Sequence, residues 1–329
     1  MSARVIERLL SSGAIGGAHR LSDVSPVKLD TTALPGGSLV MLLFLDNDPE
    51  PRYVLRVPRT PDHPERILTN YGSLRELSRV PAIANSVPRP VFCGNVDGLL
   101  ASIETCVPGL PLAVSLRIAR HEGRYEEAAR LFDIAAQWVW HLHSATMANG
   151  VDADGCGERR STVDTAIRAL QGAGLVSHSQ AASLMAAIDD ADRRGMPLSR
   201  VHGDYNPNNM LLEARERLSV IDWEFSRTGW SLWDLFTLAR TAWFHPAGVD
   251  EPNPSNALSL WDPRTHIGRA FRSALQRYEA RTGLRRDQSR MLFSVYVAEL
   301  LWEHQIKDRA PGVPPSGQWR ALLRAALEH

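Results

Sequence analysis

The residues best placed to do chemistry lie on either side of one short segment. The run His202 to Asn209 precedes it and Asp222 follows it, while residues 210–221 consist of two apolar stretches around a polar turn. That pattern predicts a β-hairpin. Two loops that flank one hairpin can converge on a single magnesium ion, and Asp204 lies on the first loop. Phosphoryl transfer needs a carboxylate beside the attacking hydroxyl and ligands for the metal, so the arrangement indicates that chemistry.

The same residues also allow a purely structural interpretation. Asp204 can cap a turn, and Asn206, Asn208 and Asn209 can hold loop conformations through their side chains. The presence of Asp222 after the hairpin, and of a basic strand residue upstream, favours the catalytic interpretation.

The order of these residues resembles that of the aminoglycoside phosphotransferase and choline kinase superfamily, whose members have a protein-kinase-like fold. The resemblance rests on His202-Gly-Asp204 with Asn209, and on Ile221-Asp222-Trp-Glu224, where Asp222 follows Asp204 by eighteen residues. It implies that Asp204 is the base or positioner of the acceptor hydroxyl, that Asn209 and Asp222 bind magnesium, and that His202 braces the loop. Asp204, Asn209 and Asp222 are therefore the expected catalytic residues.

Two further positions follow from the same resemblance. Glu224 stands where many members carry glycine, as in the choline and ethanolamine kinase branch, and faces either the metal or the substrate. Downstream, Gly229 to Leu235 matches the family segment in which an aspartate opens a helix beneath the catalytic loop. Asp234 is then a structural residue.

The nucleotide side is expected near the N-terminus. Tyr53 to Pro58 resembles the family strand whose basic residue contacts the nucleotide phosphates, which assigns that role to Arg56, and Glu76 resembles its partner on the following helix. A guanidinium binds phosphate bidentately and does not titrate near neutral pH. An ordinary surface ion pair is the alternative interpretation for Arg56 and Glu76.

Two backbone segments complete the expected nucleotide site. Gly36, Gly37 and Ser38 fall where a phosphate-covering turn belongs, because glycine lets backbone amides approach phosphate closely; a plain hairpin turn is the alternative. Residues 103–107 resemble the hinge between kinase lobes, where backbone groups, here those of Glu104 and Cys106, hold the nucleotide base. The sequence leaves ATP and GTP equally open as the nucleotide.

The elements that position these residues divide the chain into a β-rich part and a helical part. Strands are expected at 39–45, 53–57, 91–93 and 99–107 with one helix at 64–80, and helices follow Pro108-Gly109, most clearly at 126–148; residues 149–160 are expected to form a loop. We therefore expect an α+β, protein-kinase-like bilobal fold. Its N-terminal nucleotide-binding lobe spans residues 1–107, its C-terminal catalytic and substrate-binding helical lobe spans 108–329, and the active site lies between them.

Composition excludes several other classes of protein. Basic and acidic residues both number 37, so no net charge favours nucleic acid or an anionic membrane as a partner. The start of the chain resembles neither a secretory signal nor a membrane span, and the three cysteines form no C-x-x-C pair. These features predict a cytoplasmic protein without disulfides or a thiolate zinc site. His141 and His143, two residues apart, lie on different helix faces and are assigned to packing.

The phosphate acceptor is a small molecule with a hydroxyl group, but its identity stays open. Asp250, Glu251 and Asp262 can receive a polyamine such as an aminoglycoside, and Trp302 with other tryptophans can form a cage for a quaternary ammonium, although a solvated loop and core packing explain these residues equally. An aminoglycoside or other antibiotic, a choline-like amino alcohol, and a sugar or nucleoside remain candidates.

Two functions from other classes compete with phosphotransfer. A kinase-like module can bind nucleotide without catalysis, but it has no need for all of Asp204, Asn209 and Asp222. A metal-dependent hydrolase built on His202, Asp204 and Asp222 needs no acceptor and no Arg56. A protein kinase is disfavoured, because the chain lacks an activation segment between Asp-Phe-Gly and Ala-Pro-Glu motifs.

Overall fold

The described chain forms two compact units that interleave along the sequence. The computed structural model describes residues 2–11, 13, 20–29, 37–46, 48–60, 64–96, 98–147, 153–194, 196, 198–213, 216–246, 248–307 and 315–328. Unit 1 comprises Met1–Leu110 and Asn209–Ser226, and unit 2 comprises Pro111–Asn208 and Arg227–His329. Residues 209–226 therefore belong with the N-terminal segment, whereas the sequence analysis assigned them to the second lobe. The lobe boundary at 107/108 stays a prediction.

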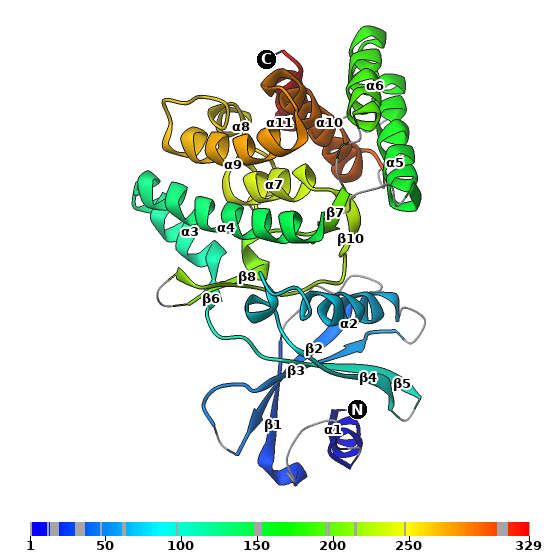
Figure 1. The fold of residues 1–329 in the computed structure, drawn as a ribbon, viewed down its shortest axis with the longest axis vertical. Coiled ribbons are helices and arrows are strands. Elements are labelled where there is room, and N and C mark those ends of the chain that lie inside the picture. Colours follow the sequence, from blue (N-terminus) through cyan, green and yellow to red (C-terminus); the bar gives the residue numbers. More distant parts are fainter. Residues whose placement is uncertain are drawn as a thin grey trace. The chain divides into compact units, whose positions relative to one another are not determined.

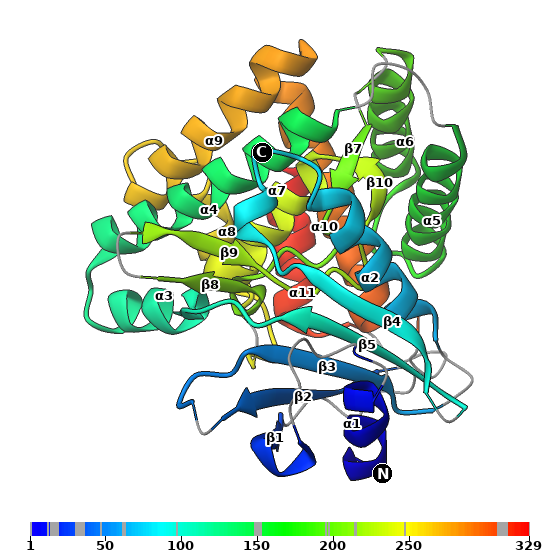
Figure 2. The same cartoon turned by 60° about the horizontal axis from the view of Figure 1, so that its bottom comes forward.

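Unit 1 is built on a five-stranded antiparallel sheet in the order β1-β2-β3-β5-β4 (Figure 1). The strands are β1 (Val24–Lys28), β2 (Ser38–Leu45), β3 (Tyr53–Pro58), β4 (Pro90–Val96) and β5 (Leu99–Thr105). The helical elements are α1 (Ser2–Ser11), η1 (Leu21–Asp23), α2 (Glu65–Leu77) and η2 (Ala84–Ser86). Helices α1 and α2 lie on opposite faces of the sheet (Figures 1 and 2). The strands and the helix expected in this part of the sequence are confirmed.

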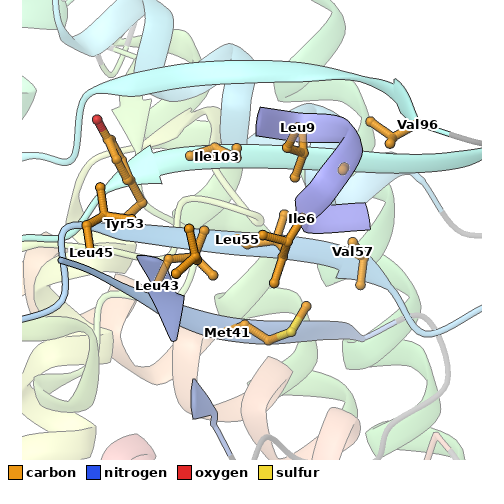
Figure 3. Packing of buried hydrophobic residues seen from close by; sticks show 12 residues of the cluster. Ile6, Leu9, Met41, Leu43, Leu45, Tyr53, Leu55, Val57, Val96 and Ile103 are labelled. Atoms are coloured by element: carbon orange, nitrogen blue, oxygen red, sulfur yellow. The ribbon is translucent and has the colours of Figure 1, made fainter. Parts of the chain in front are cut away.

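The period of two along each strand divides its side chains between the two faces of the sheet. Ile6 and Leu9 of α1 pack on a buried apolar cluster that includes Leu55 of β3 and Ile103 of β5 (Figure 3). The next residue along β3, Arg56, points to the opposite face. The same strand thus contributes to the core with its odd-numbered residues and to the α2 face with Arg56.

The expected hairpin is confirmed in unit 1 as β8 (Met210–Leu212) and β9 (Leu218–Val220). Met210 pairs with Val220, and beyond the strands the Ile221 amide donates to the Asn209 carbonyl at 2.9 Å. This bond brings the two flanks of the hairpin side by side. At Gly109, φ is 124° and a Cβ would stand 3.0 Å from the Leu212 backbone, so only glycine fits there.

Unit 2 consists mostly of helices around α4. Its helices are α3 (Leu112–His121), α4 (Tyr125–Thr146), α5 (Ala153–Gly172), α6 (His178–Arg193), α7 (Leu232–Ala239), the π-helix η5 (Arg240–Phe244), α8 (Pro254–Ser259), α9 (His266–Thr282), α10 (Arg286–Gln305) and α11 (Gly317–Leu327). Helix α4 packs against α3, α7 and α9, and confirms the expected helix at 126–148. The remaining described elements are β6 (Leu110–Pro111), which starts at the end of unit 1, η3 (Pro207–Asn209), and the antiparallel pair β7 (Leu198–Val201) and β10 (Arg227–Trp230).

One expectation about unit 2 is wrong. Residues 149–160 were expected to form a loop, yet α5 begins at Ala153. Helix α5 packs against α6 and α10, and this tertiary contact outweighs the low helix propensity of the glycines in its first turns. No helix among the described residues is long and apolar enough to span a membrane.

The apolar face of the unit 1 sheet predicts a large cost for removing one side chain. Leu55 is 0% exposed, so Leu55→Ala leaves a cavity and is expected to lower the free energy of unfolding by about 2–5 kcal/mol. Val91→Ala, at a position 37% exposed on β4, is the control and is expected to change it little. Urea unfolding followed by circular dichroism measures both; equal midpoints for the two variants would contradict the assigned core.

Candidate functional site

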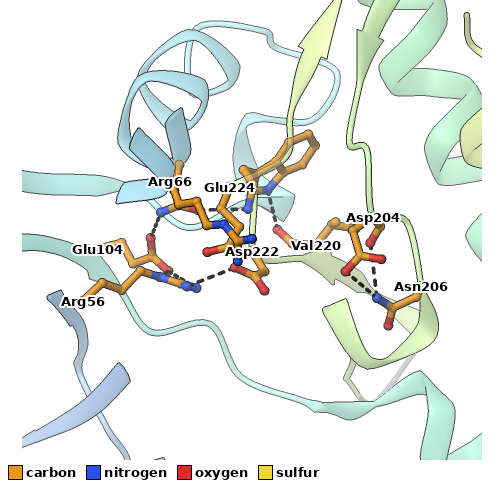
Figure 4. A network of polar contacts seen from close by, with 10 residues as sticks. Arg56, Arg66, Glu104, Asp204, Asn206, Val220, Asp222 and Glu224 are labelled. Atoms are coloured by element: carbon orange, nitrogen blue, oxygen red, sulfur yellow. Dashed lines mark hydrogen bonds and ion pairs between the residues drawn. The ribbon is translucent and has the colours of Figure 1, made fainter. Parts of the chain in front are cut away.

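Arg56 is the centre of a buried charge network in unit 1 (Figure 4). Its Nε and Nη2 atoms each lie 3.4 Å from Oε1 of Glu104, and Nη1 donates to Oδ1 of Asp222 at 3.0 Å. The arginine is 6% exposed and Glu104 is 4% exposed. Burial alone would lower the pKa of Arg56, but the charges of Glu104, Asp222 and Glu224 outweigh it and raise that pKa above its ordinary value. The guanidinium is therefore a permanent cation.

Asn70 of α2 fixes this network and was missed in the sequence analysis. Its Nδ2 donates to Oε2 of Glu104 at 2.7 Å, and its Oδ1 accepts from the amide of Trp223 at 2.9 Å. Asn70 is 1% exposed and lies on the helix face that also buries Ile67 and Leu74. The sequence did contain a signal for this role, because Asn70 is a polar residue spaced so that it falls on the apolar face of the helix. A polar side chain buried there must be hydrogen-bonded.

Asp222 has a backbone conformation that few residues adopt. Its φ is 68°, in the left-handed region, where aspartate and asparagine are the non-glycine residues best tolerated. Hydrogen bonds hold both neighbours, since Ile221 donates to the Asn209 carbonyl and Trp223 donates to Asn70. The carboxylate is thereby directed toward Arg56 by a backbone fixed on both sides.

The structure shows where two acidic residues of unit 1, Glu224 and Glu76, lie. Glu224, whose orientation the sequence left open, accepts from Nη1 of Arg66 on α2 at 3.2 Å. Glu76 was expected to orient Arg56, but the partners of Arg56 are Glu104 and Asp222, and Glu76 is exposed on α2. The expected pairing is wrong because Glu76 lies off the helix face that Asn70 presents to the sheet. A contact of Glu76 with nucleotide stays a prediction.

The backbone segments expected to bind nucleotide are only partly described. Gly36 lies outside the described residues, while the Gly37 carbonyl accepts from Arg59 at 3.1 Å and Ser38 opens β2. At the expected hinge, the Cys106 amide donates to the Arg52 carbonyl at 2.9 Å, so the sheet already uses this donor. Burial, followed by the charge of Glu104, raises the pKa of the Cys106 thiol, which is therefore a poor nucleophile.

The loop that carries Asp204 belongs to unit 2, up to Asn208. The Asp204 amide donates to Nδ1 of His202 at 3.3 Å, and its Oδ2 accepts from Nδ2 of Asn206 at 2.9 Å. Asn206 in turn accepts from the Asn208 amide at 2.9 Å. Below the loop, Tyr205 is buried and donates to the Ala135 carbonyl at 2.8 Å. Asp204 itself is half-buried, so its carboxylate is fixed by the loop without being removed from solvent.

Asp234, in the first turn of α7, holds this loop from behind. Its carboxylate accepts from the amides of His202 at 2.7 Å and Gly203 at 3.1 Å, and lies 3.1 Å from Nε2 of His143. The other ring nitrogen of His143 is 2.8 Å from the Tyr278 hydroxyl. Burial alone would raise the pKa of Asp234, but the hydrogen bond and charge of His143 and the contacts with His202 lower it. The structural role expected for Asp234, and the packing role of His143, are what these contacts provide.

A cavity of about 610 Å³ adjoins the same loop within unit 2. Pro207 and Asn208 form one side of it, and helix α3 and the π-helix η5 form others. Three of its lining residues carry basic groups, namely Arg117, Arg120 and His121. These residues were not expected from the sequence, because nothing in it relates α3 to the loop that carries Asp204.

The acidic residues expected to bind a substrate do not line this cavity. Asp250 and Glu251 are exposed, and Asp262 is paired with Arg264, whose hydrogen bonds lower the pKa of Asp262 to about 2. The Lys307 ammonium lies over the Trp302 ring, 5.3 Å from its centroid. The tryptophans of unit 2 also form no single cage, since Trp233, Trp243, Trp261 and Trp302 have different neighbours. These contacts do not test whether Asp250, Glu251, Asp262 or Trp302 binds a substrate, so that role stays a prediction.

Comparison with known proteins decides the family. The sequence pattern of the Phosphotransferase enzyme family matches residues 30–293, which is most of the chain. The chain belongs to this family. Among curated proteins, no sequence relative matches it.

Solved structures of members of the phosphotransferase family share the fold. Macrolide 2'-phosphotransferase MphH from Brachybacterium faecium is 17% identical, with a TM-score of 0.51, over 97% of this chain and 96% of that one. Aminoglycoside phosphotransferase APH(4)-Ia is 16% identical, with a TM-score of 0.50, over 99% and 96%. The α+β, protein-kinase-like fold is therefore confirmed, and the family makes this chain a phosphotransferase that acts on the hydroxyl groups of small molecules.

The position of Asn70 in the phosphotransferase predicts the effect of removing it. Asn70→Ala removes the bond from Nδ2 to Oε2 of Glu104 and the bond from the Trp223 amide to Oδ1, at about 1–3 kcal/mol for each buried group that loses this bond. We expect a lower free energy of unfolding in urea and weaker nucleotide binding by calorimetry. Leu68→Ala, at a position 50% exposed on the same helix, is the control. Unchanged nucleotide affinity in a destabilised Asn70→Ala variant would confine Asn70 to a structural role.

The lowered pKa of Asp234 predicts how stability depends on pH. Because the pKa in the folded state lies below the ordinary value of 3.8, the ionised carboxylate stabilises the fold at higher pH, and this contribution disappears as pH falls through the folded-state pKa. The difference in unfolding free energy between wild type and Asp234→Asn is expected to be largest above about pH 5 and to narrow below about pH 4. Asp250→Asn, at an exposed position, is the control in urea titrations. A difference that stays constant down to the acid transition would contradict this assignment.

Proposed function

We propose that this phosphotransferase moves the γ-phosphate of ATP or GTP, bound with Mg²⁺, onto a hydroxyl group of a small molecule. The observation that carries the proposal is the buried Arg56 guanidinium, which joins Glu104 to the carboxylate of Asp222. A permanent cation is thereby fixed beside the acid that the family motif gives to the metal. Nucleotide phosphates need both a cation and a metal ligand.

The residues present fit a magnesium ion. The carboxylate of Asp222 and the amide of Asn209 are oxygen ligands of the kind that Mg²⁺ prefers, and the bond from Ile221 to the Asn209 carbonyl holds their backbones side by side. No cluster of three or more His, Cys, Asp or Glu side chains suited to a metal occurs in the described part of the chain. Magnesium is commonly held by one or two protein ligands together with phosphates and water, so this donor set suffices. When bound, the ion neutralises charge on the phosphates.

The roles of the chain's own residues follow from their positions. Arg56, oriented by Glu104, binds phosphate oxygens. Its Nη1 donates to Asp222, so phosphate competes with the Asp222 carboxylate for this donor. Asp204 accepts the proton of the acceptor hydroxyl as the new O–P bond forms and the nucleoside diphosphate departs. The hydrogen bonds to His202 and Asn206 keep Asp204 in place, so little reorganisation accompanies transfer.

The acceptor belongs to one of the classes that the sequence left open, an aminoglycoside or other antibiotic-like molecule, a choline-like amino alcohol, a sugar or a nucleoside. The hydrolase alternative gains no support, because Arg56 is held within the same network as Asp222 and has no role in a reaction without phosphate binding. A module that only binds nucleotide leaves the bracing of Asp204 without a purpose.

Removing the Asp204 carboxylate tests the proposal. Asp204→Ala is expected to lower kcat by about 10²–10⁴-fold in nucleotide consumption with magnesium and an acceptor panel, with nucleotide affinity retained, because the proton acceptor is lost. Arg56→Ala is expected to weaken nucleotide binding instead. The control is Asp287→Ala, at an exposed position paired with Arg285.

Three results separate the alternatives. A phosphorylated product seen by mass spectrometry with wild type but not with Asp204→Ala supports the proposal. Turnover without acceptor that survives Arg56→Ala supports the hydrolase. Nucleotide binding without any transfer to any acceptor supports the silent module.

A further inference from the structure

We propose that the cavity beside the catalytic loop in unit 2 is the acceptor site and that it selects a hydroxylated acceptor carrying an anionic group, a carboxylate or a phosphate. This inference rests on the proposed function and narrows its substrate class. It makes a polycationic aminoglycoside an unsuitable acceptor, although the solved structures with the same fold include an aminoglycoside phosphotransferase.

The position of the cavity connects it to Asp204. Pro207 and Asn208 line it, and the Asn208 amide donates to Asn206, whose side chain donates to the Asp204 carboxylate. The lining and the proposed base therefore belong to one hydrogen-bonded loop. A molecule in the cavity lies against the loop that would receive its hydroxyl proton.

The charges lining the cavity are all of one sign in the described part of the chain. Arg117, Arg120 and His121 project from the last turns of α3, and no carboxylate is among the described lining residues. Among the described residues, Arg120 donates only to the Ala242 carbonyl, at 3.2 Å, and Arg117 forms no ion pair. Burial lowers the pKa of Arg120, as expected for a cation partly desolvated without an acidic partner.

Some arginines of unit 2 pair with carboxylates, as Arg130 does with Glu127. Others show no carboxylate partner in the described part of the chain, such as Arg240, whose Nε donates to the Tyr296 hydroxyl. The cavity brings two arginines of the second kind together beside the loop that carries Asp204. Two guanidiniums left without carboxylates around one cavity are suited to an anion, since arginine binds carboxylate and phosphate bidentately. An ammonium group about 4 Å from either would be repelled by about 1–4 kcal/mol.

Aromatic side chains give the cavity an apolar wall. The Trp243 ring is packed edge-on against Tyr125, with centroids 6.2 Å apart, and the Arg120 guanidinium lies 4.9 Å from the Trp243 centroid. The Trp243 indole is held by a bond from Nε1 to Oγ of Ser259 at 2.9 Å. A cation stacked on a fixed ring presents an anion site beside an apolar surface, which suits an acceptor with a ring or apolar body and an acidic group.

The test uses four benzyl alcohols whose para substituents carry different charges. They are 4-(hydroxymethyl)benzoate, 4-(hydroxymethyl)benzamide, 4-(aminomethyl)benzyl alcohol and 4-(hydroxymethyl)phenyl phosphate, and binding to the full-length protein is measured by ligand-observed NMR at millimolar concentration. We expect the two anions to bind at least about tenfold more tightly than the cation, with the neutral amide between them. The benzoate and phosphate arms show which anion is preferred.

Variants assign the preference to the cavity. Arg117 is exposed and Arg117→Gln should leave the fold intact, so we expect the anion preference to fall about tenfold in this variant. Arg130→Gln on α4, outside the cavity, is the matched control and is expected to keep the full preference. Arg117→Glu is expected to reverse the order of the benzoate and the amine.

The proposal is overturned if the amine binds as well as the benzoate, if none of the four probes binds, or if Arg117→Gln and Arg130→Gln behave alike. Its failure is distinct from that of the proposed function. An anion preference lost in Arg117→Gln, together with no phosphate transfer by wild type, would retain the pocket assignment and remove the phosphotransferase role. Asp204-dependent transfer of phosphate to a polyamine would retain the phosphotransferase role and remove the proposed preference for an anionic acceptor.

Discussion

The arrangement of unit 1 depends on the requirement that a buried guanidinium be paired. A charge removed from water is costly unless acids and hydrogen bonds surround it, so Arg56 on β3 needs Glu104 on β5 and Asp222 after β9. Asn70 then joins α2 to both ends of this network. Sheet, helix and hairpin are thereby fixed relative to one another. Apolar residues of similar size would often serve stability as well as a buried ion pair does, so stability alone does not explain why arginine is retained. The phosphate-binding role that we propose for Arg56 accounts for a positive charge at that point.

Unit 2 uses a buried charge of the opposite sign in a different way. Asp234 lies behind the catalytic loop and accepts from two of its amides, while His143 occupies another side of the carboxylate. The loop backbone is thus fixed by an acid that is itself withdrawn from solvent. Asp204 on the same loop remains half-buried and available. In the proposed function, the buried charge of unit 1 is the group that binds phosphate, whereas the buried charge of unit 2 only orients the loop that carries Asp204.

The sequence predicted the elements and motif residues better than it predicted their partners. Alternation along β3 and the polar flanks of the hairpin are local signals, so the strand with Arg56 and the loops with Asp204 and Asp222 were found in the right elements. The partner of Arg56 was assigned to Glu76, because a helix-borne acid is the familiar arrangement, while Glu104 supplies it from the neighbouring strand. Strand pairing and the meeting of α3 with the catalytic loop are non-local, so neither could be read from spacing alone.

The π-helix η5 has a consequence for how this enzyme family can diversify. A π-turn accommodates one additional residue inside a helix without unfolding it. Because the wider turn takes up that residue, an insertion or deletion there changes which side chains stand at the positions of the π-turn and leaves the preceding helix in register. Thr241, Ala242 and Trp243 of η5 all line the cavity. A single insertion or deletion in a gene could therefore replace a whole wall of the cavity at once, while the buried Asp234 upstream in α7 keeps its place. If that wall faces the acceptor, as we propose, one genetic step changes several contacts to it together, which a series of substitutions would otherwise have to do.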